Sequence, residues 1–330
     1  MSALTLLFVA AFAGLVPMLC YTAILWWLDH WEREPLPLVI GCFLWGAVPS
    51  IVFSIVWSLI FGTIAAGIFY GEHALTIVEY SVIAPFTEEI VKGLGLLVIF
   101  FAFRHEIDSL FDGILYGAVI GFGFAAVENV FYFIGYGSEG PGQLTVLIFL
   151  RAILFGLNHA FFTGLTGLGL AMARFQKDAG LKLLLPLGGL GLAMVCHATH
   201  NFFAGGGLGG VVVSFIVDWF GIFWLFAVIL WSMNHQGNLI RHYLNEEVAM
   251  GVLQPQQAQL AGSFSHRLAC GFGLFGHHIT SRQNSHRLDQ LCAELAFKKH
   301  HLATMGEETG NSQAIGELRQ QVAQISQQLA

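Results

Sequence analysis

The residues most able to do chemistry are glutamates and histidines that lie inside strongly apolar stretches of the chain. Glu88 and Glu89 are followed by Lys92 one helical turn later, and His197 precedes Asn201 by four residues. Residues at these spacings lie on one face of an α-helix. Each pair can therefore contact a single metal ion or a single catalytic water.

A metal site can be assembled from residues in three different stretches. Catalytic zinc usually has three protein ligands and a water in the fourth position. Glu128, His159 and His197 supply a Glu-His-His set of this type. The zinc ion polarises a scissile carbonyl and lowers the pKa of its bound water towards about 7. These residue types predict a zinc site for hydrolysis.

A further glutamate is then free to act as the general base, and Glu88 and Glu89 are both candidates. Asn201 can fix a ligand or donate a hydrogen bond to an oxyanion. Several of the polar residues in the apolar stretches also have a purely structural interpretation. Glu89 and Lys92 can form a plain buried ion pair, and Asp218 and Arg151 are more typical of structural partners than of ligands. His200 is more typical of an interior histidine with its hydrogen bonds satisfied.

The composition indicates that these residues lie in a membrane. The chain has 330 residues, of which 56% are hydrophobic and only 11% charged. Soluble domains have about 25% charged residues, because a surface in water needs polar cover. The formal net charge of -7 argues against nucleic acid as a partner. Lipid is the solvent that removes the need for a polar surface.

Seven stretches have the roughly 20 apolar residues that a spanning helix needs. The sequence therefore predicts an all-α, polytopic transmembrane helical bundle of about seven spans. The spans are expected at 3–27, 37–69, 77–103, 112–134, 143–173, 182–204 and 209–232. In the fourth stretch, Gly113, Gly117 and Gly121 form a GxxxGxxxG stripe that lets helices pack closely.

The depths of the candidate residues in their spans agree only in part. Glu88, Glu128 and His197 all fall in the outer half or near the middle of the bilayer. His159 lies deepest, and the set extends over roughly 15 Å at 1.5 Å per helical residue. We therefore expect the boundary of the 143–173 stretch to be the least accurate.

Lysine and arginine determine the expected orientation, because cytoplasmic loops are enriched in them. The second, fourth and sixth connections contain neither residue. The first, third and fifth connections and the start of the tail carry Arg33, Arg104, Arg174, Lys177, Lys182 and Arg241. The sequence thus predicts an N-terminus outside the cell and a C-terminus in the cytoplasm.

The chain divides by composition into residues 1–232, the transmembrane bundle, and residues 233–330, a cytoplasmic C-terminal tail. The tail is richer in Gln, His and charge, and 243–261 and 313–329 have helical periodicity. A regulatory role is one hypothesis for it. His277-His278 and His300-His301 are interpreted as scattered histidines rather than as a metal site.

Several motifs together resemble the PrsW family of intramembrane metalloproteases. TEEIVKG at 87–93 is similar to the EExxK motif of that family, and 111–132 resembles its next block, with Phe124 and Glu128 as FxxxE. His159 matches the third element, and HATHN at 197–201 resembles the fourth, with Asn201 where Asp is common. The related CAAX-processing proteases have EExxxR and FxxxH instead, which favours the PrsW branch.

The resemblance implies hydrolysis of peptide bonds within or beside a bacterial-type plasma membrane. By position, Glu88 or Glu89 would activate water, while Glu128, His159 and His197 hold the metal, with zinc as the expected ion. A glutamate-activated water without a metal is an alternative. The implied substrate is a membrane-anchored protein similar to an anti-sigma factor.

Two other classes of function fit the same composition. Intramembrane Glu, His and Asp residues also relay protons in transporters and ion-coupled carriers. Such carriers often contain inverted repeats, and none is evident here. A catalytically idle membrane scaffold is the other alternative, although every candidate catalytic position is filled.

Overall fold

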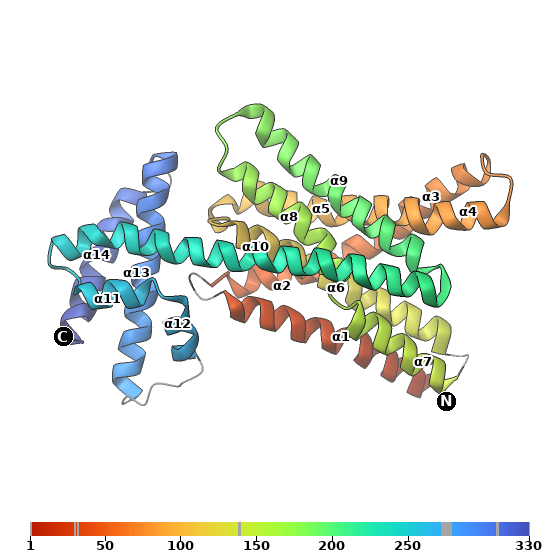
Figure 1. Cartoon of the computed structure of the whole chain (residues 1–330), viewed down its shortest axis with the longest axis horizontal. Helices are drawn as coiled ribbons and strands as arrows, with labels where there is room; N and C mark the ends of the chain where they lie inside the picture. The colour runs from red at the N-terminus through yellow and green to blue at the C-terminus, as the bar shows by residue number, and fades with distance from the viewer. Residues whose placement is uncertain are drawn as a thin grey trace. The chain divides into compact units, whose positions relative to one another are not determined.

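The computed structural model describes residues 2–29, 31, 33–137, 140–271, 279–307 and 310–329, and most of these residues are helical. Within those ranges there is no β-strand, which confirms the predicted all-α class. The chain forms two compact units (Figure 1). The first comprises Met1–Trp26 and Glu34–Ile229, and the second comprises Trp27–Arg33 and Leu230–Ala330.

The first unit contains the apolar helices, several of which consist of consecutive segments. In chain order they are α1 (Ala3–Leu28), α2 (Leu36–Trp45), η1 (Gly46–Ser50), α3 (Ile51–Ala66), α4 (Glu72–Val78), η2 (Glu79–Ile83), α5 (Ala84–Ala102), η3 (Arg104–Glu106), α6 (Leu110–Gly137), α7 (Pro141–Ile148), η4 (Phe149–Leu154), α8 (Asn158–Arg174), α9 (Ala179–Ala204) and α10 (Gly207–Ala249). The last of these continues into the second unit.

Six helical stretches in the described residues are long and apolar enough to cross a membrane, namely Ala3–Leu28, Leu36–Ala66, Leu110–Gly137, Pro141–Arg174, Ala179–Ala204 and Gly207–Ala249. The predicted span at 77–103 is also helical but is not among the six. It carries Glu88, Glu89 and Lys92, whose charge makes that helix too polar by composition alone. The multi-pass character is confirmed, and a crossing by this helix stays a prediction.

Helix α6 forms the centre of the first unit, and most of its residues are buried. The predicted glycine stripe lies against α8. A Cβ atom on Gly113, Gly117 or Gly121 would be 2.4, 2.5 or 2.2 Å from the carbonyl oxygen of Gly167, Thr163 or His159. Side chains larger than hydrogen do not fit at these distances. The stripe therefore sets how closely the backbone that carries His159 approaches α6.

Three helices contain a wider, π-helical segment, at η1, η2 and η4. Pro49 lies inside η1, and Pro85 comes two residues after the end of η2. Proline has no N–H for the helical ladder, so the preceding turn must widen or break. The predicted span 143–173 is interrupted at residues 155–157, between η4 and α8. This break lies in the stretch whose boundary we expected to be the least accurate because of the depth of His159, and Pro141–Arg174 is still one of the six apolar stretches.

The second unit has a hydrophobic core of its own. Its helices are the end of α10, α11 (Pro255–Ala261), α12 (Phe264–Gly271), α13 (Ile279–Met305) and α14 (Asn311–Gln328). Leu244, Cys292 and Val322 are fully buried in this core, and Trp31 belongs to it as well. The periodic segment 243–261 is two helices rather than one, and α13 was not predicted. His277-His278 lie outside the described residues.

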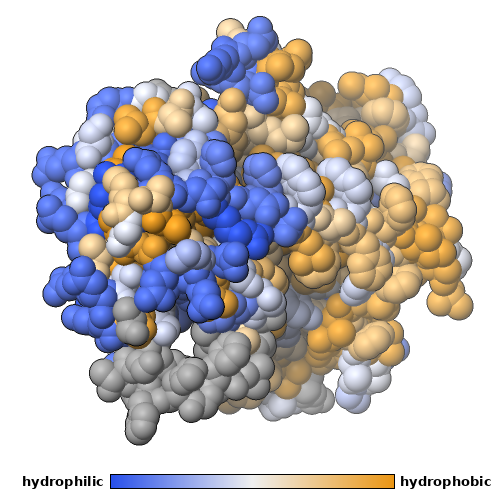
Figure 2. Space-filling model, turned by 60° about the vertical axis from the view of Figure 1, so that its left-hand side comes forward, coloured by the Kyte–Doolittle hydropathy of each residue, from blue (hydrophilic) through white to orange (hydrophobic). Residues whose placement is uncertain are grey.

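The two units differ in how hydrophobic their surfaces are. Figure 2 shows mostly hydrophobic residues on the visible surface of the first unit and mostly hydrophilic residues on that of the second. Large apolar side chains of the first unit, such as Phe8, Leu59 and Phe220, are more than half exposed. A surface of this kind is stable in lipid and not in water.

Candidate active site

Helix α5 brings an acidic pair and a lysine into the interior of the bundle. Lys92 is completely buried, and its Nζ lies 2.7 Å from Glu89 Oε1 and 3.6 Å from Glu88 Oε2. The ammonium group also lies 3.1 Å from His159 Nδ1 and 4.0 Å from the centre of the Phe124 ring. Because carboxylates, an imidazole nitrogen and an aromatic face surround it, the buried charge of Lys92 is compensated.

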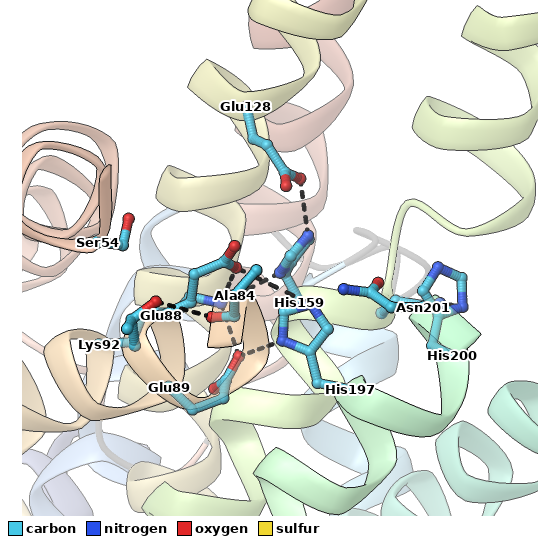
Figure 3. A network of polar contacts seen from close by, with 12 residues as sticks. Ser54, Ala84, Glu88, Glu89, Lys92, Glu128, His159, His197, His200 and Asn201 are labelled. Carbon is cyan, nitrogen blue, oxygen red and sulfur yellow. Dashed lines mark hydrogen bonds and ion pairs between the residues drawn. The ribbon is translucent and has the colours of Figure 1, made fainter. Parts of the chain in front are cut away.

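Glu89, which lies on the same helix as Lys92, also orients the ring of His197. Its Oε1 lies 3.0 Å from His197 Nδ1, and Thr163 Oγ1 donates to its Oε2 over 3.1 Å. The His197 ring stacks on Phe162, with ring centres 4.8 Å apart. A carboxylate at Nδ1 requires the proton on that nitrogen, which leaves Nε2 as an acceptor. Nε2 then faces Glu88 Oε2, 3.9 Å away (Figure 3).

Glu88 differs from Glu89 in that one of its oxygens is free of hydrogen bonds. Its residue is only 8% exposed, and its buried Oε2 accepts no hydrogen bond among the described residues. A buried carboxylate oxygen without a hydrogen bond is costly in free energy, and such atoms concentrate at functional sites. Glu88 therefore has an open acceptor directed towards the space between the two histidines.

Glu128 and His159 form the other side of the cluster. His159 lies in the first turn of α8, immediately after the break in the helix, and its Nε2 is 2.9 Å from Glu128 Oε2. Since the Lys92 ammonium can only donate, Nδ1 of His159 accepts and Nε2–H donates to Glu128. Arg151 Nη2 also donates to Glu128 Oε2 over 2.5 Å, so this carboxylate is held from two sides.

Arg151 is fixed by further contacts within the bundle. Its Nε donates to Asn129 Oδ1 over 2.9 Å, and its guanidinium lies 3.7 Å from the centre of the Tyr132 ring. The side chain thus contacts three residues of α6. The predicted role of Arg151 as a structural partner agrees with this geometry.

The donor atoms that lie close enough for one metal ion belong to Glu88, His159 and His197, within 4.8 Å of one another. The set expected from sequence contained Glu128 in place of Glu88, and the geometry favours Glu88 as the third donor. Two histidines and a glutamate fit a catalytic zinc site in donor type. Binding through His159 requires that either Lys92 or Glu128 releases the ring.

The fourth motif divides between this cluster and a second polar network. Asn201 Nδ2 donates to the backbone oxygen of Tyr80 in η2 over 2.7 Å, so its amide nitrogen already has a partner. His200 Nδ1 lies 2.6 Å from Asp218 Oδ2 and 2.7 Å from Ser214 Oγ. These contacts agree with the structural interpretations of His200 and Asp218.

Two cavities reach the cluster from different sides. The first, which we call the α3 groove, has a volume of about 570 Å³ and is lined by Ile51, Ser54, Ile55, Ser58, Leu59, Gly62, Thr63, Ala66, Glu79, Ile83, Glu88, Phe124, Glu128 and Phe131. The second, which we call the polar cavity, has about 520 Å³, and its lining includes Glu88, Glu128, Arg151, Asn158, His159, His200 and Asn201. Glu89 lines neither cavity.

Comparison with known proteins identifies the family. Residues 34–232 match the family described as PrsW family intramembrane metalloprotease. The chain belongs to the PrsW family. Protease PrsW of Bacillus subtilis is 28% identical over 66% of this chain and 89% of its own length. Protease PrsW of Shouchella clausii is 28% identical over 66% and 92%, and that of Geobacillus kaustophilus is 32% identical over 49% and 66%.

The match gives this PrsW family member its general function, which is that of a multi-pass membrane protease. No solved structure matches the chain. Sequence reasoning did not single out Thr163 or Phe162, which hold Glu89 and His197. Thr163 follows His159 by four residues, and this helical spacing could have identified it. Phe162 carried no comparable signal, because aromatic residues are common throughout these helices.

Proposed function

We propose that the chain is an intramembrane endopeptidase that cleaves a membrane-anchored protein with water activated at Glu88, His159 and His197. The observation that carries the proposal is the buried Glu88 Oε2, which accepts no hydrogen bond and lies where two cavities meet between two histidines. Peptide hydrolysis by a metal-activated water needs open donor atoms that can hold the metal and a site from which bulk water is excluded.

In this proposal Glu88, His159 and His197 hold a zinc ion. Zinc bound there supplies a Lewis acid for the scissile carbonyl and lowers the pKa of the attacking water. Glu128 lies 2.9 Å from His159 Nε2 and lines both cavities, so it is the carboxylate available to take the proton. Arg151 holds the carboxylate of Glu128 in place through its hydrogen bond.

Glu89 and Lys92 are positioning residues in this scheme, as distinct from the acid and base. Glu89 keeps the proton of His197 on Nδ1, which directs Nε2 to the site. Lys92 compensates the charge of the acidic pair. Asn201 anchors the backbone of η2 at Tyr80, beside the segment that leads to Glu88. Its donation to an oxyanion would require release of that contact.

The orientation and the substrate class complete the proposal. Seven crossings place the N-terminus outside and the tail in the cytoplasm, in line with the distribution of Lys and Arg. The substrate proposed from the family resemblance is a membrane-anchored protein similar to an anti-sigma factor. The C-terminal unit, with its own core, is proposed as a regulatory domain.

The test is cleavage of single-span reporter proteins by the purified full chain in liposomes. Glu88→Gln and His197→Gln should each lower the rate by more than about 100-fold, because losing a zinc ligand is at least as severe as losing a ligand's hydrogen-bond partner. Glu72→Gln is the matched control, because Glu72 is an exposed glutamate on α4 that lines neither cavity. Cleavage at the wild-type rate by both site variants would disprove the proposed centre.

Metal analysis of the same samples tests the zinc ion separately. One zinc per chain is expected, with loss of metal in His197→Gln and loss of activity with a chelator. Full activity without any metal would instead make Glu88 the general base. The rate assay on Glu88→Gln therefore tests the centre, and the metal content tests only its cofactor.

A further inference from the structure

The α3 groove leads from the lipid-facing surface of the first unit to the catalytic cluster. Ile55 and Leu59 of α3 line the groove and are also 47% and 67% exposed. The visible surface of the first unit is mostly hydrophobic (Figure 2). A side chain that both faces lipid and lines the cavity marks an opening in the plane of the membrane. A membrane-embedded segment can enter through it without crossing water.

Glu88 and Glu128 are the two residues that line both the α3 groove and the polar cavity among the described residues. A peptide chain that occupies both cavities must therefore pass these two carboxylates. The bond beside them is the one positioned for hydrolysis. One side of the substrate would then lie in the α3 groove and the other in the polar cavity.

The inner wall of the groove is unusually polar for a membrane helix. Ser54 and Ser58 of α3 line it, followed by Gly62 and Thr63. Ser58 Oγ lies 2.9 Å from Thr87 Oγ1, one residue before Glu88, and Ser54 lies on the α3 side of Glu88 (Figure 3). An unwound peptide in the membrane needs such partners for its backbone, because lipid offers none. The groove thus suits an extended substrate segment.

The charge of the groove comes from acidic residues. Its ionisable lining residues are Glu79, Glu88 and Glu128, and it has no lysine, arginine or histidine among the described residues. Glu88 and Glu128 contact cationic or histidine side chains, whereas Glu79 is exposed and has no ion pair within the described part. Gly62 leaves room for Glu79, since a Cβ there would be 3.2 Å from Glu79 Oε1.

We propose that the α3 groove binds the substrate in an extended form, and that Glu79 binds a lysine or arginine side chain of that substrate. The proposal rests on the proposed protease function and adds a specificity site to it. The open, buried acceptor on Glu88 at the end of the same groove is the independent sign that a ligand is bound there.

The distance along the helix sets the position of the basic residue. Glu79 and Glu88 are nine residues apart along η2 and α5, which corresponds to roughly 13 Å at 1.5 Å per residue. An extended peptide covers about 3.3 Å per residue. The basic residue is therefore expected about three to five residues from the scissile bond, on the side that occupies the α3 groove.

The test uses single-span reporters whose cleaved bond has been identified by mass spectrometry in the wild-type protein. Lys, Gln or Glu is placed in turn three, four or five residues from that bond, on either side. The wild type should cleave the best Lys reporter about fivefold faster, in kcat/KM, than its Gln counterpart, the value for a partly exposed ion pair. Glu79→Gln should abolish this preference, and Glu79→Lys should transfer it to the Glu reporter.

Glu72→Lys is the matched control, since it makes the same charge change seven residues earlier outside the groove. It should keep the wild-type preference. The proposal is overturned if Glu79→Lys retains the preference for Lys, or if the wild type shows none at any position. Failure of the protease function itself is distinguishable, because then no reporter is cleaved in a manner that depends on Glu88.

Discussion

Replacement of Gly121 by alanine tests whether the approach of α6 to α8 positions the catalytic histidine. A Cβ at Gly121 would lie 2.2 Å from the carbonyl oxygen of His159, whereas ordinary contact begins at 3.4 Å. The two backbones must therefore separate locally by about 1.2 Å. Overpacking of this kind costs about 1–3 kcal/mol. A displacement of about 1 Å at a catalytic group can lower the rate by about 10²-fold.

Two other glycines of α6 separate the effect on stability from the effect on position. Gly113→Ala produces a similar clash, 2.4 Å from the carbonyl oxygen of Gly167, but two helical turns away from the contact with His159. A Cβ at Gly135 would meet no atom of the described residues within 4 Å outside the backbone of its own helix. All three substitutions add the same methyl group to the same helix, so they form a matched series.

The assays are thermal unfolding in detergent and reporter cleavage in liposomes. Gly121→Ala should lower both the unfolding temperature and kcat, Gly113→Ala chiefly the unfolding temperature, and Gly135→Ala neither. The reasoning is refuted if Gly121→Ala cleaves reporters at the rate of Gly135→Ala. It is also refuted if Gly113→Ala and Gly121→Ala lose the same amount of activity, because the loss would then follow stability alone.

Three further predictions concern the ion pairs and the topology. Lys92→Met should destabilise the protein by about 3–5 kcal/mol in a thermal-unfolding assay, because it leaves the buried carboxylate of Glu89 uncompensated. The double variant with Glu89→Gln should recover part of that loss, and no recovery would contradict a direct ion pair. Arg151→Gln should lower kcat at least tenfold while the circular dichroism spectrum stays unchanged, since Glu128 loses a hydrogen bond of 2.5 Å. An unchanged kcat would show that Arg151 does not position Glu128 for catalysis. A cysteine added after residue 329 should react with impermeant reagents only from the cytoplasmic side, and labelling from outside would reverse the proposed orientation.

The sequence by itself determined that the chain is a membrane-embedded helical bundle and which residues are candidates for its chemistry. Low charge and long apolar runs leave lipid as the only suitable solvent, which is a property of composition. Glu88, Glu128, His159 and His197 stood out because ionisable groups are costly in that solvent. The glycine stripe of α6 was likewise readable as a packing surface before its partner α8 was known.

Only the tertiary structure decided which contacts each of these residues makes. Helical spacing places Glu88 and Glu89 100° apart on one helix, but it does not say which of them faces a cavity. Packing turns Glu89 towards Lys92 and His197 and leaves Glu88 Oε2 without a hydrogen bond. Glu128 lies against Arg151 and is not among the donor atoms of Glu88, His159 and His197 that lie within 4.8 Å of one another. These contacts depend on the rotation of one helix against another.

The depth of His159 in the membrane was the feature that the sequence predicted least well. An uninterrupted helix over 143–173 would place His159 well below the other candidates. The chain instead breaks at 155–157, so that α8 begins at Asn158 and His159 lies beside Glu128 and Lys92. Such a break is stable only where the surrounding protein satisfies the freed backbone groups. Those partners come from distant segments, so local sequence determined the residue and the assembled bundle determined its place.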